Sequence, residues 1–529
     1  MKNRKVLPFT EEWDLYEKGK EYNYSINLYE NVNTNERFFR GDQWDNLNSG
    51  GLPTPVFNIF KRIIGYFTSS IMQTPIKMRF SFNSPYGVNG FGEEEARIAS
   101  EKLNRISDMR WEKNKMDNLL ASSLTDAAVS GDAVCYTYWD PNVKTGQPFT
   151  GDFKTVLIDN TNVFFGDPNS KNVQAQPYIL IAQRETVESL ITQAKANGIS
   201  KEEIKKIVPD DDTVSQSGDL AKIELQGTKC ISLIKLWKDE NGRVLYRKSV
   251  RNTVIKDTTE TMLSLYPIAF FNWAEVKNSW HGQAVGTGLI DNQIFINKGF
   301  AMVMKHMMDT AFSKVVYDST VLDGWSDRVG EAIAVNGPVE NVAKVISPGQ
   351  MQSGMLEMLT MAITHTKEFL GANDAALGDV APNNTSAILA LQNTSAIPLE
   401  NVKRCLYQFV EDIGLIWLDF MFSYYDDKRL VELKGDEDSS YESFSLSKFK
   451  NALFGCKVDV GASSYWSEIS SLNTLDSLLK LNRISTVQYL SRLPDGLIPD
   501  KDRLIEEIRL AEEQAKQEGQ EQEQIENHQ

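Results

Sequence analysis

The chain has 529 residues, of which 41% are hydrophobic and 24% are charged, and its formal net charge is −16. This composition is typical of a folded globular protein, and the length corresponds to roughly two to four domains. The excess of carboxylates argues against a protein that coats DNA tightly and non-specifically, because such binding needs clustered Lys and Arg to displace counterions. The same charge is compatible with a protein that DNA merely passes.

The first half of the chain changes from polar to helical and then to β-rich. Residues 1–60 are polar and contain many turn residues, which predicts mostly loop. From 130 to 275, short segments rich in Val, Ile, Tyr and Phe, with a hairpin signal at Asn241-Gly242, predict an α+β domain. The predicted helices are 59–72, 93–130 (ended by Gly131) and 185–197, and the predicted strands are 133–139, 155–158, 162–165, 178–184, 229–239 and 243–250.

In the second half, two helical segments flank a short β-like insert. Residues 288–313 and 350–370 have apolar residues at helical spacing, whereas 314–348 contains short β-like pieces and turn residues. The order helix, insert, helix predicts a long helical hairpin with a compact module at its tip. Further helices are predicted at 385–396, 399–425, 469–480, 486–491 and 500–520, and a strand at 454–460.

Patterns that carry catalysis or metal binding are missing from the sequence. The four cysteines form no CxxC pair, which argues against a zinc knuckle and favours reduced, buried thiols. The four histidines have neither HxxxH nor HExxH spacing, and Gly286-Thr287-Gly288 lacks the third glycine of a dinucleotide loop. We therefore expect no enzymatic activity and no cofactor or metal.

Membrane insertion and secretion are not indicated either. No run of about 18 apolar residues occurs, and the first residues lack the apolar core of a signal peptide. We expect a soluble protein of cytoplasmic origin with no membrane partner.

The two helices that flank the insert are rich in methionine. Eight of the 15 methionines lie there, and two interpretations stay open: they fill a helix–helix seam, or they form a packing surface that tolerates sliding. On the first helix, Lys298 and Lys305 are seven residues apart and share a face, so they are either solvated or part of a charged ring in an assembly. The methionines are Met302, Met304, Met307, Met308, Met351, Met355, Met358 and Met361.

The order of these pieces and several local motifs resemble the portal proteins of tailed bacteriophages. The resemblance covers nearly the whole chain. It begins at Phe38-Phe39-Arg40-Gly41-Asp42-Gln43-Trp44, followed by Pro55 and Asn58, and continues at Asn162-Val163-Phe164-Phe165-Gly166-Asp167-Pro168. Further matches are Tyr266-Pro267, Gly282, Gly286, Gly288, Gln293, Asn297, the segment from Gly371 to Leu391, Val458, Gly461, Ser463, Ser464, Glu468, Ile484-Ser485 and Leu493-Pro494-Asp495.

The resemblance implies a portal-like α+β fold with named parts. These are a wing at 1–283 and 401–468, stem helices at 284–313 and 349–370, a small α/β clip at 314–348, a tunnel segment at 371–400 and a helical crown at 469–529.

The resemblance also implies a ring, usually of twelve copies, at a unique capsid vertex of the virion, assembled in the host cytoplasm. The ring would nucleate capsid assembly, dock the terminase and later the head-completion proteins, and let DNA pass during packaging and ejection. The implied partners are further copies of the chain, the major capsid protein, the scaffolding protein, the terminase large subunit, head-completion or adaptor proteins, and double-stranded DNA without sequence specificity.

Residue-level expectations follow from these parts. Asn393, Thr394 and Ser395 are candidates for touching DNA in the tunnel. Trp325, Arg328 and Asn336 are candidates for partner contacts of the clip, because Trp and Arg are frequent interface anchors, or they belong to the insert's own core and surface. The alternatives to a portal are another structural head component, such as a minor head or adaptor protein, and a nuclease, for which the sequence offers no carboxylate cluster with metal-binding spacing.

Overall fold

A computed structural model describes most of the chain outside several gaps. The described residues are 10–45, 47–73, 75–82, 93–145, 150–210, 228–311, 314–322, 324, 326, 334–336, 338, 340, 342–346, 353–369, 399–425, 430–432, 441–443, 454–459, 475–481, 483–493, 504, 505 and 508.

Residue contacts divide the chain into two compact units, Met1–Ile71 with Met78–Lys457, and Met72–Lys77 with Val458–Gln529. In the second unit, a helix at 475–480 precedes α13 (Thr486–Leu490), whose start is fixed by a capping box between Ser485 and Gln488. Within the described residues, no helix is long and apolar enough to span a membrane.

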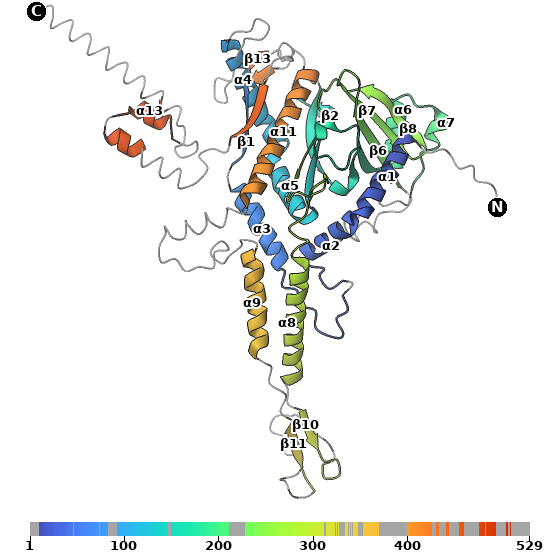
Figure 1. Ribbon diagram of the computed structural model, residues 1–529, viewed down its shortest axis with the longest axis vertical. Helices are drawn as coiled ribbons and strands as arrows, with labels where there is room; N and C mark the ends of the chain where they lie inside the picture. The colour runs from blue at the N-terminus through green and yellow to red at the C-terminus, as the bar shows by residue number, and fades with distance from the viewer. Residues whose placement is uncertain are drawn as a thin grey trace, which may run out of the picture. The chain divides into compact units, whose positions relative to one another are not determined.

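Most helices and strands belong to the first unit, and α3, β1 and β14 extend one or two residues beyond its bounds (Figure 1). Its helices are α1 (Glu11–Ser25), α2 (Leu28–Arg40), α3 (Ile59–Met72), α4 (Glu93–Lys113), α5 (Met116–Ser130), α6 (Val187–Ala196), α7 (Lys201–Ile204), α8 (Ile290–Thr310), α9 (Ser353–Phe369) and α11 (Glu400–Tyr424). Its strands are β1 (Lys77–Phe82), β2 (Asp132–Lys144), β3 (Thr150–Ile158), β4 (Val163–Phe165), β5 (Ile179–Thr186), β6 (Lys229–Lys238), β7 (Val244–Val250), β8 (Thr253–Glu260), β9 (Ile268–Asn272), β10 (Lys314–Tyr317), β11 (Ala343–Ile346), β12 (Leu430–Glu432), β13 (Tyr441–Ser443) and β14 (Phe454–Asp459).

Two sheets form the centre of this unit. One has the strand order β3-β2-β9 and the other β4-β5-β6-β7-β8, and all their strand pairs are antiparallel. Helices α5 and α11 pack on the smaller sheet, while α1 and α6 pack on the larger one. This mixture of helices and mainly antiparallel sheets agrees with the predicted α+β class.

Several predicted elements are confirmed by the structure. The helix 59–72 is α3, the strand at 314–317 is β10, and the hairpin around Asn241-Gly242 is the β6–β7 pair, with Gly242 at φ +77°. The long helix predicted from 93 to 130 is instead split into α4 and α5, because Lys115 adopts a left-handed conformation at φ +51°.

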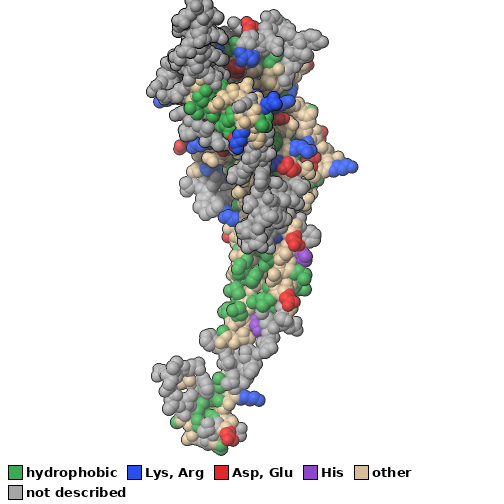
Figure 2. All heavy atoms as spheres, turned by 90° about the vertical axis from the view of Figure 1, so that its left-hand side faces the viewer, with side chains coloured by type: hydrophobic (Ala, Val, Ile, Leu, Met, Phe, Trp, Pro, Cys, Tyr) green, Lys and Arg blue, Asp and Glu red, His purple; other side chains and the backbone are tan. Residues whose placement is uncertain are grey.

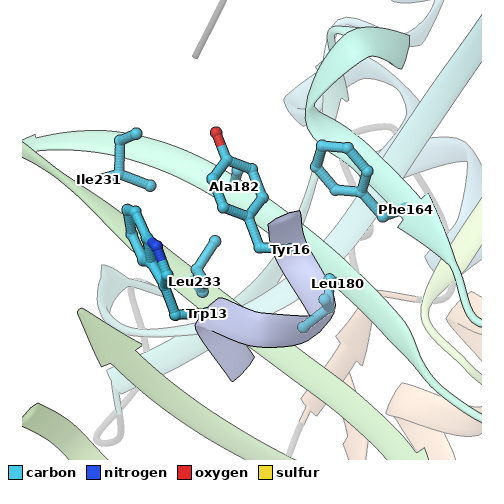
Figure 3. Packing of buried hydrophobic residues seen from close by; sticks show 7 residues of the cluster. All are labelled: Trp13, Tyr16, Phe164, Leu180, Ala182, Ile231 and Leu233. Atoms are coloured by element: carbon cyan, nitrogen blue, oxygen red, sulfur yellow. The ribbon is translucent and has the colours of Figure 1, made fainter. Parts of the chain in front are cut away.

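The prediction that residues 1–60 are mostly loop is wrong, because α1 and α2 lie within them. Helix α1 is polar overall and buries two aromatic side chains, Trp13 and Tyr16, instead of a row of aliphatic residues. Figure 3 shows both against the larger sheet, where the Tyr16 ring meets the Phe164 ring edge-on at 5.3 Å. Burying two large aromatic rings offsets the low helical hydrophobicity of this segment.

The four cysteines form no disulfide. Cys135, Cys230 and Cys456 are buried, as predicted, whereas Cys405 is only partly buried. Burial raises the pKa of the Cys135 thiol to about 12, so this thiol stays protonated and unreactive at neutral pH.

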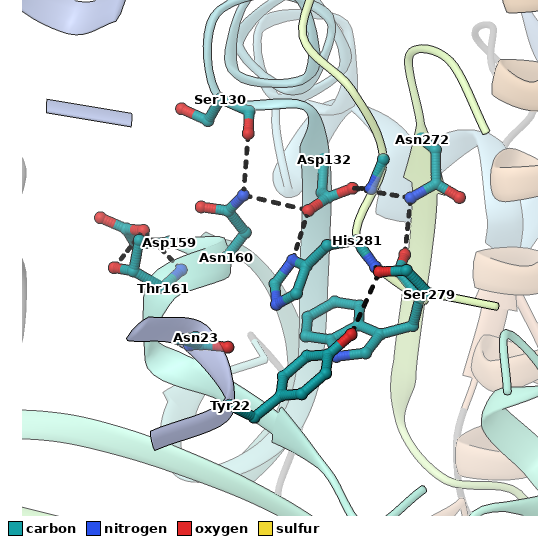
Figure 4. Close-up of polar contacts among 12 residues, drawn as sticks. Tyr22, Asn23, Ser130, Asp132, Asp159, Asn160, Thr161, Asn272, Ser279 and His281 are labelled. Carbon is teal, nitrogen blue, oxygen red and sulfur yellow. Dashed lines mark hydrogen bonds and ion pairs between the residues drawn. The ribbon is translucent and has the colours of Figure 1, made fainter. Parts of the chain in front are cut away.

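A buried carboxylate fixes the segment that leads from β9 towards α8. Asp132 is 1% exposed, and its two oxygens accept four hydrogen bonds (Figure 4). Oδ1 accepts from Asn272 Nδ2 and the Gly282 amide, each at 2.6 Å, and Oδ2 accepts from His281 Nδ1 at 2.7 Å and Asn160 Nδ2 at 3.1 Å. One side chain therefore joins β2, β9 and two loops.

Removing this carboxylate should destabilise the unit strongly. Asp132→Ala leaves several buried donors without an acceptor, so we expect a loss of about 3–5 kcal/mol in the free energy of unfolding, measured in urea at low protein concentration. Glu101→Ala is the control, because Glu101 pairs with Arg97 on the surface of α4 and should contribute at most about 1 kcal/mol. Equal urea midpoints for the two variants would contradict the assigned role of Asp132.

Candidate functional site

Helices α8 and α9 lie side by side and form the helix pair predicted from the sequence (Figure 1). Their inner seam is narrow, because Gly299 of α8 faces the buried side chain of Leu359, and a Cβ at position 299 would overlap it. Ala301 and Val303 are also buried on α8. Small and branched residues thus set the distance between the two helices.

A chain of buried amides anchors the start of α8 to the body of the unit. Gln293 Oε1 accepts hydrogen bonds from the amides of Ile59 and Phe60 at 3.1 and 3.2 Å. These are orphan N–H groups of the first turn of α3, so Gln293 caps a helix other than its own.

The same chain continues towards α2. Gln293 Nε2 donates to Asn297 Oδ1 at 3.0 Å, and Asn297 Nδ2 donates to Gln43 Oε1 at 2.7 Å. Gln43 Nε2 in turn donates to the Phe38 carbonyl at 3.0 Å. All three amide side chains are at most 3% exposed, so α8, α3 and the end of α2 are held as one polar, fully buried joint.

Beyond this joint, the helix pair exposes large apolar side chains. Figure 2 shows hydrophobic side chains gathered on it. Met307, Met308, Met358 and Met361 are between 59% and 64% exposed, far more than side chains in a folded interior. We call this set the apolar faces of the helix pair; its members are Phe295, Met302, Met304, Met307, Met308, Leu356, Met358 and Met361.

One interpretation was that the methionines fill the seam between the two helices. It is wrong for the six that are exposed, which are Met302, Met304, Met307, Met308, Met358 and Met361. The seam is filled by Gly299 and Leu359, while Met358 and Met361, three residues apart on α9, point away from it. Contiguous exposed apolar surface of this kind marks an interaction site in a soluble protein. Met351 lies outside the described residues, and Met355 is partly buried.

The two predicted lysines both lie on α8. Lys298 is exposed, and Lys305 forms an i,i+4 ion pair with Asp309 at 2.8 Å. Both side chains of this ion pair are about half exposed, at 44% and 52%, so the pair contributes little to stability.

Two of the short β-like pieces predicted in the insert pair with each other: β10 and β11 are antiparallel, from Lys314↔Ile346 to Tyr317↔Ala343. Asp318 begins the following turn and accepts hydrogen bonds from the amide and hydroxyl of Thr320, which hold the pKa of its carboxyl below the ordinary value. The backbone amide of Asn336 donates to the Val321 carbonyl at 3.2 Å.

The remaining predicted site residues lie outside the described part of the chain. These are Trp325 and Arg328 of the insert and Asn393, Thr394 and Ser395 of the following segment. In the part that the structure does describe, no three His, Cys, Asp or Glu side chains are placed to hold a metal ion.

The sequence analysis missed the roles of Gln293 and Phe295. Two amides four residues apart, Gln293 and Asn297, interrupt the apolar face of a helix, and such a pair indicates a buried polar joint. Phe295 adjoins them and is 47% exposed, which periodicity alone does not reveal.

Comparison with known proteins finds a matching family. The family model described as Phage P22-like portal protein matches residues 200–529, which is more than half of the chain and includes α8, the insert and α9. No curated protein matches the chain.

The joint at Gln293 should matter for stability even though it lies at the end of a helix. Gln293→Leu removes the acceptor of the Phe60 amide and one of the two partners of both the Ile59 amide and the Phe57 carbonyl, so we expect the free energy of unfolding to fall by about 1–3 kcal/mol. The neighbouring exposed Asn292→Leu should change it by no more than about 0.5 kcal/mol. Urea unfolding of both variants measures the difference, and a neutral Gln293→Leu would argue against the joint.

Proposed function

The chain belongs to the P22-like phage portal protein family, and we propose that it assembles with further copies of itself into a ring through which double-stranded DNA passes. Proteins of this family are structural components of the bacteriophage capsid. The assembly into a ring with other phage head proteins follows from membership. The number of copies, about twelve, remains part of the proposal.

The apolar faces of the helix pair carry this proposal. A single chain leaves Met307, Met308, Met358 and Met361 in water, at an unfavourable free energy that falls when a neighbouring copy covers them. The faces lie on two different helices, so the contact joins unlike surfaces of successive copies. Such heterologous contacts close into rings when the rotation between copies allows it.

The parts of the chain take their proposed roles from this arrangement. We infer that 1–283 and 401–468 form a wing, that 284–313 and 349–370 form a stem, and that 314–348 forms a clip that docks the terminase and later the head-completion proteins. Residues 371–400 would line the tunnel and 469–529 would form a crown inside the capsid. The amide joint at Gln293 supports a stem that is held firmly against the wing.

The net charge of the proposed ring favours passage of DNA over retention of DNA along most of its surface. Each copy carries −16, so an assembled ring repels a polyanion overall. Lys298 and Lys305 would repeat around the stem as local rings of positive charge, the ring of Lys305 being weaker because Asp309 pairs with it. The tunnel residues Asn393, Thr394 and Ser395 would offer small polar contacts. Trp325, Arg328 and Asn336 are the proposed clip contacts with partners or neighbouring copies.

Ring formation should depend on the apolar faces. The double variant Met302→Glu with Met358→Glu places a carboxylate on each helix, where burial against a neighbour is unfavourable, so the ring fraction should fall about tenfold or more. The matched variant Met302→Leu with Met358→Leu keeps apolar area and should form rings normally. Native mass spectrometry measures the ring fraction, and circular dichroism checks that each chain is folded. Wild-type ring formation by the folded glutamate variant would sink the proposal.

The stem lysines should affect DNA rather than assembly. Lys298→Glu with Lys305→Glu reverses both proposed rings of charge, so particles built with it should retain less packaged DNA. Lys201→Glu with Lys205→Glu makes the same change in net charge at exposed positions of the wing and should behave as wild type. The DNA content of particles after storage is the measurement, and identical retention by both double variants would leave the stem lysines without this role.

A further inference from the structure

A second feature, independent of ring formation, is a cavity of about 520 Å³ between the two sheets. Strands β2 and β3 form one side, strands β5 to β8 the other, and the end of α11 covers part of it. Its volume lies in the range of about 300–1,000 Å³ that is typical of sites for small organic ligands. Neither the family nor the helix pair explains it.

Aromatic rings line much of this cavity. Trp139 stacks on Tyr424 at 4.8 Å between ring centroids, with 16° between their planes, and Phe420 stacks on Tyr424 at 5.6 Å. On β2, Tyr136 and Tyr138 stack at 5.8 Å. Such walls favour a flat aromatic or branched apolar body, which gains both apolar burial and ring contacts.

The cavity also holds phenol groups that no neighbour satisfies. Tyr136 is buried and Tyr246 is partly buried, and among the described residues no hydrogen bond of either hydroxyl is found. By contrast, the Tyr424 hydroxyl donates to the Thr261 carbonyl at 2.5 Å. Because both residues line the cavity, their hydroxyls are available to donate a hydrogen bond to a ligand there.

Both phenols keep their protons at neutral pH. Burial raises the pKa of Tyr136 and of Tyr246 well above the ordinary value, and neighbouring tyrosines add to the shift for Tyr136. A protonated phenol donates a hydrogen bond, so the ligand group between them should be an acceptor.

The charges at the cavity favour an anion. Lys248 and Lys256 lie directly opposite each other on β7 and β8. Lys248 is neutralised by Glu185 at 2.5 Å, and Glu260 is paired with Arg243. Lys256 has its ammonium 5.2 Å from the centre of the Tyr246 ring, and among the residues that the structure places it has no carboxylate partner.

We propose that this cavity binds a carboxylate carried on an aromatic or branched apolar body. The body lies against Trp139, Phe420 and Tyr424, and the carboxylate accepts hydrogen bonds from the phenols and pairs with Lys256. A free aromatic acid and the C-terminal residue of a peptide present this same chemistry. Both are therefore used as probes.

The test measures binding to the full chain by saturation-transfer NMR and calorimetry. The probes are 3-phenylpropionate and the peptide Gly-Gly-Phe, and their neutral counterparts are 3-phenylpropanamide and Gly-Gly-Phe amide. We expect saturable binding of at least one carboxylate and weaker binding of its amide by about tenfold. Binding of the free acid alone identifies a small-molecule site, and binding of the peptide identifies a site for a protein C-terminus.

Two conservative variants locate the binding. Tyr136→Phe keeps the ring but removes the donor and should weaken the carboxylate about fivefold, and Lys256→Gln should weaken it about tenfold. The controls are Tyr407→Phe on α11 and Lys201→Gln on α7, which are outside the cavity and should bind as wild type. Absence of saturable binding, equal affinity for acid and amide, or wild-type binding by both cavity variants would overturn the proposal.

Discussion

The direction of α8 depends on a side chain that satisfies another helix. The first N–H groups of α3 have no acceptor within their own helix, and Gln293 of α8 provides one. Because Asn297 and Gln43 extend the same hydrogen-bonded row, a tilt of α8 would break several buried bonds at once. The body and the helix pair therefore move together at this point, and the exposed faces farther along α8 keep a fixed direction.

The two ends of the helix pair differ in the kind of contacts that they make. Near Gln293 the contacts are polar, directional and complete within one chain, whereas farther along they are apolar and incomplete. Methionine suits the second region, because its unbranched thioether side chain fits surfaces of different shape with little loss of packing. Gly299 complements this, since its closeness to Leu359 keeps the pair narrow and leaves both outer faces free for neighbours.

The sequence predicted elements whose signal is local. Helix α3 has a continuous apolar pattern, and the β6–β7 hairpin has Asn241-Gly242 at its turn, so both were predicted close to their bounds. Helix α1 escaped prediction because Trp13 and Tyr16, two rings on an otherwise polar segment, anchor it through contacts with a sheet that forms much later in the chain.

The candidate site was only partly predictable from the sequence. The order helix, β-like insert, helix and its methionines are visible in the sequence, but periodicity shows only that a face is apolar and not what covers it. The spacing of Gln293 and Asn297 indicates a polar contact, but it does not identify the partner, because the capped residues of α3 lie more than 200 positions away in the sequence. The cavity lined by Tyr136 and Tyr246 likewise exists only once two sheets face each other.

The charge of the chain is unevenly distributed. This distribution is more compatible with weak contact to DNA than with tight binding of DNA. The chain as a whole carries −16, yet α8 contains two lysines, Lys298 and Lys305, and two aspartates, Asp291 and Asp309, so its formal charge is balanced. Lys305 and Asp309 already neutralise each other, which leaves Lys298 as the exposed cation of the helix. In the proposed ring, a near-neutral α8 within an acidic assembly would keep a polyanion away from most surfaces, so that DNA would move past it with few contacts to break.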